Sequence, residues 1–476
     1  MKIKLLIITF FISTNLFAQQ KFAGIWEGRI SAGVDLRIVF HFSLDSSGTI
    51  SATMDSPDQS AFGMKTDYTY TSNDSIYTGI NQFKITFSGI ILNDSTISGQ
   101  FKQATTSIPL ELKKVKKVST TIRSQTPVEP FPYDTEEINY NSGSNVQLYG
   151  TLTSPKLDPS INYLKQPVFP AVILITGSGP QNRDEEILGH KPFAVIADYL
   201  TKKGFIVLRV DDRGTGKSTG NFESATSADF AADVNAGINF LKKRKEIDTS
   251  KIGLLGHSEG AMVAPIVAAK RKDIYFIILL AGPGIKNIDL MTEQNLKIYN
   301  SMGISKKTQD AYGPLYKKMS LSAIKNADSV TALKEAAIVF NTWLKGKDPL
   351  ILKELNLQTP ASQKAYIKNM TTGLQGPWFK YFLQYDPAPV LMKLTSKVLA
   401  LNGDKDLQVI ATSNLTGMET ALKKSGTDYE IHSIPGVNHL FQTCKSCLVS
   451  EYGELDETIS PKVLDLIGNW LTRKVY

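Results

Sequence analysis

Apolar and polar residues alternate in short runs through the first part of the chain. Clear examples are residues 36–42, 68–71, 83–87 and 97–101, with turn-forming Asn, Asp, Ser and Gly residues between the runs. Alternation with a period of two is typical of strands that bury one face. Short strands at this regular spacing predict an all-β domain over residues 19–117, either a small barrel or a sandwich.

The pattern changes after residues 118–132, which contain three prolines and have the composition of a linker. Over residues 133–476, largely apolar runs alternate with longer amphipathic segments. These runs include residues 170–176, 205–210, 251–255, 275–281 and 398–401. Continuous apolar runs predict strands buried on both faces of a parallel sheet, and the segments between them predict the covering helices. We therefore expect an α/β fold for this second domain.

A helical segment at about residues 282–389 interrupts the alternation of strands and helices. An insert at this place would lie over the carboxyl ends of the strands, where parallel sheets bind their ligands, and would act as a cap. Its last part contains an aromatic cluster with Trp378, Phe379 and Phe382. These rings either contact substrate beneath the cap or form the hydrophobic core of the cap itself.

The run at 251–255 leads directly into Gly256-His257-Ser258-Glu259-Gly260, which has the form G-x-S-x-G. Glycines on both sides of a serine allow a strand and the following helix to approach closely, so that the hydroxyl projects above the sheet. The small apolar residues 261–269 predict that helix. Ser258 is therefore the candidate nucleophile. The backbone N–H of Glu259, at the helix N-terminus, is a candidate oxyanion donor.

A serine nucleophile needs a base, and in this kind of layout the order along the chain is serine, acid, histidine. His439 lies in the loop after the predicted strand at 429–434 and fits this order. Of the other four histidines, His41 lies in the first domain, His190 precedes the serine, His432 lies within a strand, and His257 lies in the serine turn itself. We expect His257 to point away from the serine.

The loop after the run at 398–401 contains two candidate acids, Asp404 and Asp406. We favour Asp406 because it lies further into the loop, immediately before the next helix. The second oxyanion donor is expected in the glycine-rich loop at 176–180, where the N–H of Ser178 is the best candidate.

Five segments together resemble the α/β-hydrolase superfamily, and more narrowly exported bacterial hydrolases that are similar to serine aminopeptidase (S33)-like and dienelactone-hydrolase-like enzymes. They are residues 173–185, 207–220, 251–260, 399–409 and 434–442. The resemblance implies an α/β-hydrolase fold with a helical cap, and its G-x-x-D pattern places the acid on Asp406. It does not cover the β domain.

We expect a serine hydrolase that cleaves carboxylic esters through an acyl-enzyme and needs no metal or organic cofactor. The alternative is an aminopeptidase or acyl-peptide hydrolase acting on short peptides. Such an enzyme needs an acidic group near the pocket to bind a free amino terminus, and Glu259, Asp184 or Glu185 could supply it. A third hypothesis is a non-catalytic binding protein on the same fold.

Residues 1–18 have the pattern of a signal peptide, with Lys2 and Lys4 before an apolar run and Ala18 at the expected cleavage site. The apolar run is shorter than a membrane span. We therefore expect an exported protein, periplasmic or secreted, with no integral membrane segment after cleavage. The formal net charge of +8 is spread along the chain without a basic, aromatic-rich stripe, so nucleic acid is not an expected partner.

The chain has two cysteines, Cys444 and Cys447, in a C-x-x-C motif after the loop that carries His439. A thioredoxin-like motif would instead begin a helix after a strand, and two cysteines alone do not supply the four ligands of a zinc site. The two cysteines therefore either have a structural role or are free thiols.

Overall fold

The computed structural model describes residues 19–31, 35–59, 61–104, 106–119, 123–157, 167–326 and 328–476. It divides into two compact units, the first formed by residues up to Ser124 with Glu186–His190 and the second by Gln125–Glu185 with Lys191–Tyr476. The expected signal peptide, residues 1–18, lies outside the described residues.

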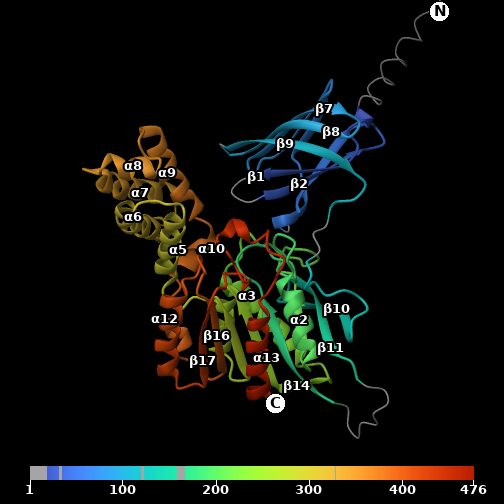
Figure 1. Cartoon of the computed structure of the whole chain (residues 1–476), viewed down its shortest axis with the longest axis vertical. Helices are drawn as coiled ribbons and strands as arrows, with labels where there is room; N and C mark the ends of the chain where they lie inside the picture. Colours follow the sequence, from blue (N-terminus) through green and yellow to red (C-terminus); the bar gives the residue numbers. More distant parts are fainter. Residues whose placement is uncertain are drawn as a thin grey trace, which may run out of the picture. The chain divides into compact units, whose positions relative to one another are not determined.

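The described part of the first unit forms one antiparallel sheet of nine strands (Figure 1). The strands are β1 (Gly24–Ser31), β2 (Asp35–Leu44), β3 (Ile50–Ser56), β4 (Ala61–Lys65), β5 (Tyr68–Ser72), β6 (Ser75–Ile80), β7 (Ile85–Asn93), β8 (Thr96–Gln103) and β9 (Thr106–Val115). They lie in the order β4-β3-β2-β1-β9-β8-β7-β6-β5. The apolar face of this sheet encloses a core that includes Trp26, Phe40 and Phe87. The unit is therefore a curled half-barrel rather than a two-sheet sandwich, because one continuous sheet supplies the whole core.

The second unit is built on a sheet of eight strands among the described residues. The strands are β10 (Tyr133–Ser142), β11 (Val146–Pro155), β12 (Phe169–Ile175), β13 (Ile206–Val210), β14 (Ile247–His257), β15 (Phe276–Leu280), β16 (Lys397–Gly403) and β17 (Tyr429–Ile434). Their order is β10-β11-β13-β12-β14-β15-β16-β17. The first two strands are antiparallel, and the six from β13 to β17 are parallel to one another.

Helices cover both faces of this sheet (Figure 1). One face carries α2 (Pro192–Lys202) and α13 (Pro461–Val475), and the other carries α3 (Ser227–Leu241), α4 (Gly260–Ala268) and α12 (Ala411–Ser425). Along β12, Ile173 and Ile175 face the core under α3 and α4, whereas Val172 and Leu174 face the core under α2 and α13. Both faces are buried, which explains why the strand is apolar at every position.

Between β15 and β16 lie seven helices of the described chain. They are α5 (Asn287–Ser301), α6 (Lys306–Lys325), α7 (Ser329–Leu344), α8 (Pro349–Glu354), α9 (Pro360–Gly373), α10 (Pro377–Gln384) and α11 (Ala388–Leu391). Helices α6, α7 and α9 share a small core around Met319 and Phe340. Helix α10 instead packs on the main core through Phe382 and Leu383, and Figure 1 shows it near the strand ends, with α6–α9 to one side. Among the described residues, none of the helices combines the length and apolarity that crossing a bilayer requires.

Candidate active site

Ser258 lies on a sharp turn between β14 and α4. Its backbone φ is +54°, in the left-handed region that L-residues rarely adopt. A Cβ atom at Gly256 would lie 2.1 Å from the carbonyl oxygen of Gly260, and one at Gly260 would lie 2.0 Å from that of Ile175. Both positions therefore need glycine, because the strand and the helix approach more closely than any side chain allows.

Asp406 and His439 form a buried pair at the ends of β16 and β17. Oδ2 of Asp406 lies 2.8 Å from Nδ1 of His439, and the two side chains are 0% and 5% exposed. The other carboxylate oxygen accepts hydrogen bonds from the backbone N–H groups of Gln408 and Val409, at 2.7 and 2.9 Å. Because a carboxylate only accepts, Nδ1 carries the proton and Nε2 is left as the basic nitrogen.

Asp404, the other candidate acid, has a different contact. Its Oδ1 accepts a hydrogen bond from the backbone N–H of Gly436 at 2.7 Å. This contact holds the turn after β17 and leaves Asp406 as the carboxylate beside His439.

The loop that carries His439 is tied to the serine turn through His257. The Nε2 atom of His257 lies 3.0 Å from the carbonyl oxygen of His439, and the backbone N–H of Ser258 donates to Leu280 at the end of β15. In the described part of the chain, the Ser258 hydroxyl has no hydrogen bond to His439. Contacts between a nucleophile and its base often tighten only in the substrate complex.

The glycine-rich loop at 176–180 passes beside the serine. A Cβ atom at Gly177 would lie 3.4 Å from the Cβ of Ser258. The backbone N–H groups of Ser178 and Glu259 donate to no other described residue. Two unengaged donors next to a serine hydroxyl are the arrangement that an oxyanion requires.

The chain is similar to several known hydrolases. The family model described as serine aminopeptidase, S33, matches residues 191–359. Esterase EstD of Thermotoga maritima is 27% identical over 357 residues, which cover 73% of this chain and 69% of EstD. The chain belongs to the α/β-hydrolase superfamily. It is a hydrolase.

Two further similarities are more limited. Human dipeptidyl peptidase 8 is 29% identical to this hydrolase over 164 residues, which cover 32% of this chain and 17% of the peptidase. A solved structure of the Pyrococcus furiosus esterase Pf2001 has 15% sequence identity and a TM-score of 0.41, and the match covers 75% of this chain and 98% of the esterase.

His257 contacts two other loops of the site. The residue is 7% exposed, and its ring lies between the His439 carbonyl and the Glu185 carboxylate, with Nδ1 3.0 Å from Oε1. The same Oε1 accepts the backbone N–H of Gly177 at 2.5 Å. Burial disfavours the charged imidazole, but the charge of Glu185 outweighs this effect, and the pKa of His257 is raised. This pair joins the oxyanion loop, the serine turn and the base loop.

Each acidic residue that could bind an amino terminus in this hydrolase already has a partner. Asp184 forms an ion pair with Arg209, and Glu185 is held by His257. Oε1 of Glu259 accepts two hydrogen bonds, from Ser227 Oγ at 2.6 Å and from Trp378 Nε1 at 2.8 Å. Its Oε2 is buried and has no hydrogen-bond partner among the described residues. Burial raises the pKa of Glu259.

The three aromatic residues of the predicted cap cluster lie together on α10. The Trp378 ring stacks on Phe382 with centroids 4.8 Å apart, and it meets Phe379 edge-on at 4.6 Å. All three pack against the main hydrophobic core. The contact between Trp378 and Glu259 nevertheless brings this cluster to the residue next to Ser258.

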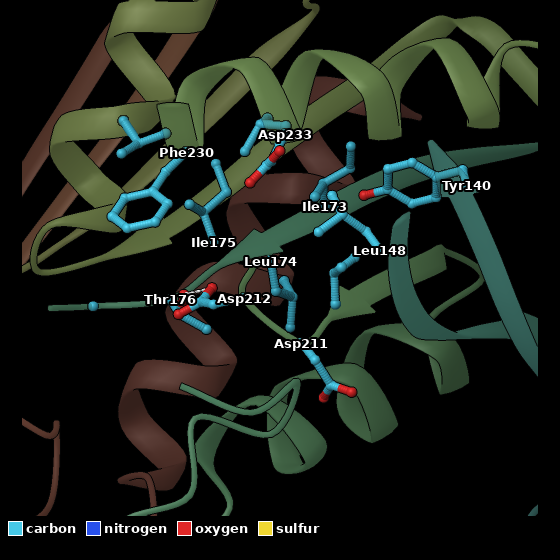
Figure 2. A pocket seen from close by; sticks show the side chains of 14 residues that line it. Tyr140, Leu148, Ile173, Leu174, Ile175, Thr176, Asp211, Asp212, Phe230 and Asp233 are labelled. Atoms are coloured by element: carbon cyan, nitrogen blue, oxygen red, sulfur yellow. Dashed lines mark hydrogen bonds between the residues drawn. The ribbon is translucent and has the colours of Figure 1, made fainter. Parts of the chain in front are cut away.

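A cavity of about 50 Å³ opens beside the oxyanion loop (Figure 2). Thr176 and Asp212 form its polar end, where the Thr176 hydroxyl donates to the Asp212 carboxylate at 2.7 Å. Burial raises the pKa of Asp212 well above its usual value. Figure 2 shows Ile173, Ile175 and Phe230 along the apolar part of the cavity. The hydrolase thus has a small, mainly apolar space beside Thr176 and Gly177, the first two residues of the oxyanion loop.

Cys444 and Cys447 form a disulfide. The backbone N–H groups of Lys445, Ser446 and Cys447 all donate to the Glu451 carboxylate, which fixes this short turn. Among the described residues, the cluster of potential metal ligands consists of Glu451 and these two cysteines. Their sulfur atoms are bonded to each other, so the motif has a structural role after the His439 loop.

Proposed function

We propose that this hydrolase cleaves carboxylic esters of short acyl groups through an acyl-enzyme formed on Ser258. The observation that carries the proposal is the buried contact between Asp406 and His439 at the strand ends where the serine turn also lies. The unengaged N–H groups of Ser178 and Glu259 support it further.

The reaction follows from the chemistry of these groups. The Ser258 oxygen attacks the ester carbonyl carbon while His439 Nε2 takes the hydroxyl proton, and Asp406 stabilises the resulting imidazolium. The negative oxygen of the tetrahedral intermediate accepts hydrogen bonds from the N–H groups of Ser178 and Glu259. Collapse of the intermediate breaks the bond to the alcohol, which leaves with the proton from His439. Water then attacks the acyl-enzyme with the same proton transfers and releases the carboxylic acid. No metal or organic cofactor takes part.

Two observations favour an ester over an amide substrate. The relative that matches most of this chain is named an esterase. Asp184 and Glu185, two of the three acidic residues that could bind a free amino terminus, are engaged in ion pairs with Arg209 and His257. The cavity of about 50 Å³ beside the oxyanion loop has room for a short acyl chain, and Trp378, Phe379 and Phe382 would cover the substrate from the cap.

An aminopeptidase is the second candidate. The family model that matches residues 191–359 is described as a serine aminopeptidase, and the unpartnered Oε2 of Glu259 is a possible acceptor for an ammonium group. The test compares p-nitrophenyl acetate and butyrate with aminoacyl-p-nitroanilides, with Ser258→Ala as control. Ester turnover that the substitution abolishes supports the proposal. Faster turnover of the anilides than of the esters would assign the enzyme to the peptidases. If wild type and Ser258→Ala are both inactive on all of these substrates, the hypothesis of a non-catalytic binding protein is favoured.

We further propose that the protein is exported. The signal-like pattern of residues 1–18 supports this, as does the disulfide, since disulfides persist mainly in oxidising compartments. Mass spectrometry of the protein from a periplasmic or culture fraction should find a mature chain that starts at Gln19. A chain that is intact and confined to the cytoplasm would contradict export.

A further inference from the structure

A hydrogen bond joins the cap to the turn that carries the nucleophile. Trp378 lies in α10 of the cap, and its Nε1–H donates to Oε1 of Glu259 at 2.8 Å. Glu259 directly follows Ser258, and its backbone N–H is one of the two proposed oxyanion donors. One residue thus presents its backbone to the reaction while the cap holds its side chain.

Burying the Glu259 carboxyl at this position costs free energy, because the group is removed from water. The residue is 3% exposed, and Oε2 has no hydrogen-bond partner among the described residues. Its Oε1 accepts hydrogen bonds from Trp378 and Ser227, and the Ser178 side chain also stabilises the charged carboxylate. A buried carboxyl that loses a donor is strongly destabilised, so movement of α10 away from the sheet would deprive Glu259 of the Trp378 hydrogen bond.

The two donors are fixed from opposite sides. Ser227 is fully buried at the first position of α3, in the body of the α/β unit. Trp378 is held from the cap side by its stacking on Phe382, which is 7% exposed. A purely apolar contact could pack the cap on the core equally well without a carboxyl next to the nucleophile. The hydrogen bond between Trp378 and Glu259 is therefore better suited to aligning the serine turn than to packing the cap alone.

We propose that Trp378 and the Glu259 side chain form a latch that couples the position of α10 to the alignment of the Glu259 N–H with the oxyanion. The inference rests on the proposed ester hydrolysis. When α10 is in place, the carboxyl is held at both donors and the serine turn keeps the geometry that the transition state needs. When α10 moves, the turn loses this restraint. In this function both side chains are positioning residues, because neither touches the reacting carbonyl.

The first test replaces Trp378 by Phe, which keeps an aromatic ring to stack on Phe382 but removes the N–H. Trp343→Phe is the matched control, because Trp343 Nε1 donates to the carbonyl of Ala311 within the cap, at 2.9 Å. A hydrogen bond to a carboxyl contributes enough that W378F should lower kcat for p-nitrophenyl acetate by about 10-fold, with KM changed less than about twofold. W343F should change neither constant by more than about twofold.

The second test is a double-mutant cycle. Glu259→Ala removes the acceptor of the Trp378 hydrogen bond and should lower kcat about as much as W378F does. In the Glu259→Ala protein, W378F should then have no further effect on kcat. If Glu259→Ala does not fold, W378F is compared with W343F alone, and a loss of kcat confined to W378F is then the expected result.

Several results would overturn the latch. The first is an increase in KM with unchanged kcat in W378F, which would mean that the ring only contacts substrate. The second is an equal loss of kcat in W378F and W343F. The third is a double variant in which the losses of kcat from W378F and Glu259→Ala multiply. Wild-type turnover that Ser258→Ala abolishes shows that the proposed function holds, so these results then count against the latch alone. A wild-type protein that is inert toward the ester overturns the proposed function and the latch together.

Discussion

The buried pair of Glu185 and His257 gives the α/β unit a stability that depends on pH. Glu185 is 5% and His257 7% exposed, and the ring nitrogens of His257 face a carboxylate and a backbone carbonyl. Because both partners are acceptors, the imidazole donates from both nitrogens only when it is protonated. Its raised pKa agrees with this state. We therefore predict that Glu185→Gln destabilises the unit and weakens its dependence on pH.

The linkage between folding and protonation of His257 sets the direction in which stability changes with pH. The pKa of His257 is higher in the folded protein than in the unfolded chain, where it is about 6.5. Its contribution to the free energy of unfolding is therefore complete below about pH 6.5, and it is lost as pH rises through the raised folded pKa. Removing one partner of a buried pair typically costs about 3–5 kcal/mol. Against a total stability of about 5–15 kcal/mol this is a large fraction.

The assay is urea unfolding of wild type and Glu185→Gln between pH 6 and 9, followed by tryptophan fluorescence. The difference between the two proteins isolates the pair, because the other ionisable groups are common to both. The difference should be largest near pH 6 and shrink toward pH 9. Equal stabilities at pH 6, or a difference that grows with pH, would refute the charged pair.

Three further predictions concern the catalytic groups. Ser258→Gly and Ser258→Ala should both be inactive, but the glycine variant should be more stable by about 1 kcal/mol, because glycine adopts the positive φ without strain; equal urea midpoints would contradict the strain. Asp406→Asn should lower kcat by about 10²–10⁴-fold. Asp404→Asn, which weakens the turn contact with Gly436 and an exposed ion pair with Lys405, should stay within about 10-fold of wild type. Similar losses in both variants would show that Asp406 has no special role. Dialysis against EDTA should leave ester turnover unchanged, and a loss restored by a divalent metal would contradict a cofactor-free mechanism.

The parts of this fold that depend on residues close together in the chain could be predicted from the sequence pattern. The glycines around Ser258 can be predicted from sequence, because α4 approaches the strands β14 and β12 so closely that side chains are excluded at those two positions. The strand segments that lead to Ser258 and Asp406, residues 252–255 and 398–401, are equally clear, since both faces of the sheet are buried there and these residues are apolar.

Contacts between distant segments could not be predicted in this way. Glu185 lies 72 residues from His257, and Trp378 lies 119 residues from Glu259. Nothing near His257 or Glu259 in the sequence signals these partners, and so the pair and the proposed latch emerge only from the structure. The half-barrel is a similar case. Alternation predicts its strands, but the pairing of β1 with β9, which makes the sheet continuous, joins residues about 90 positions apart.

The central claim is that Ser258 carries the acyl group during turnover. Wild-type protein mixed with a fluorophosphonate probe, digested and examined by mass spectrometry, should show one adduct, on the peptide that contains Ser258. The same peptide should be unmodified in Ser258→Ala, and labelling should be much slower in His439→Ala. An adduct on a different residue, or ester turnover by a wild-type protein whose Ser258 stays unmodified, would contradict the account.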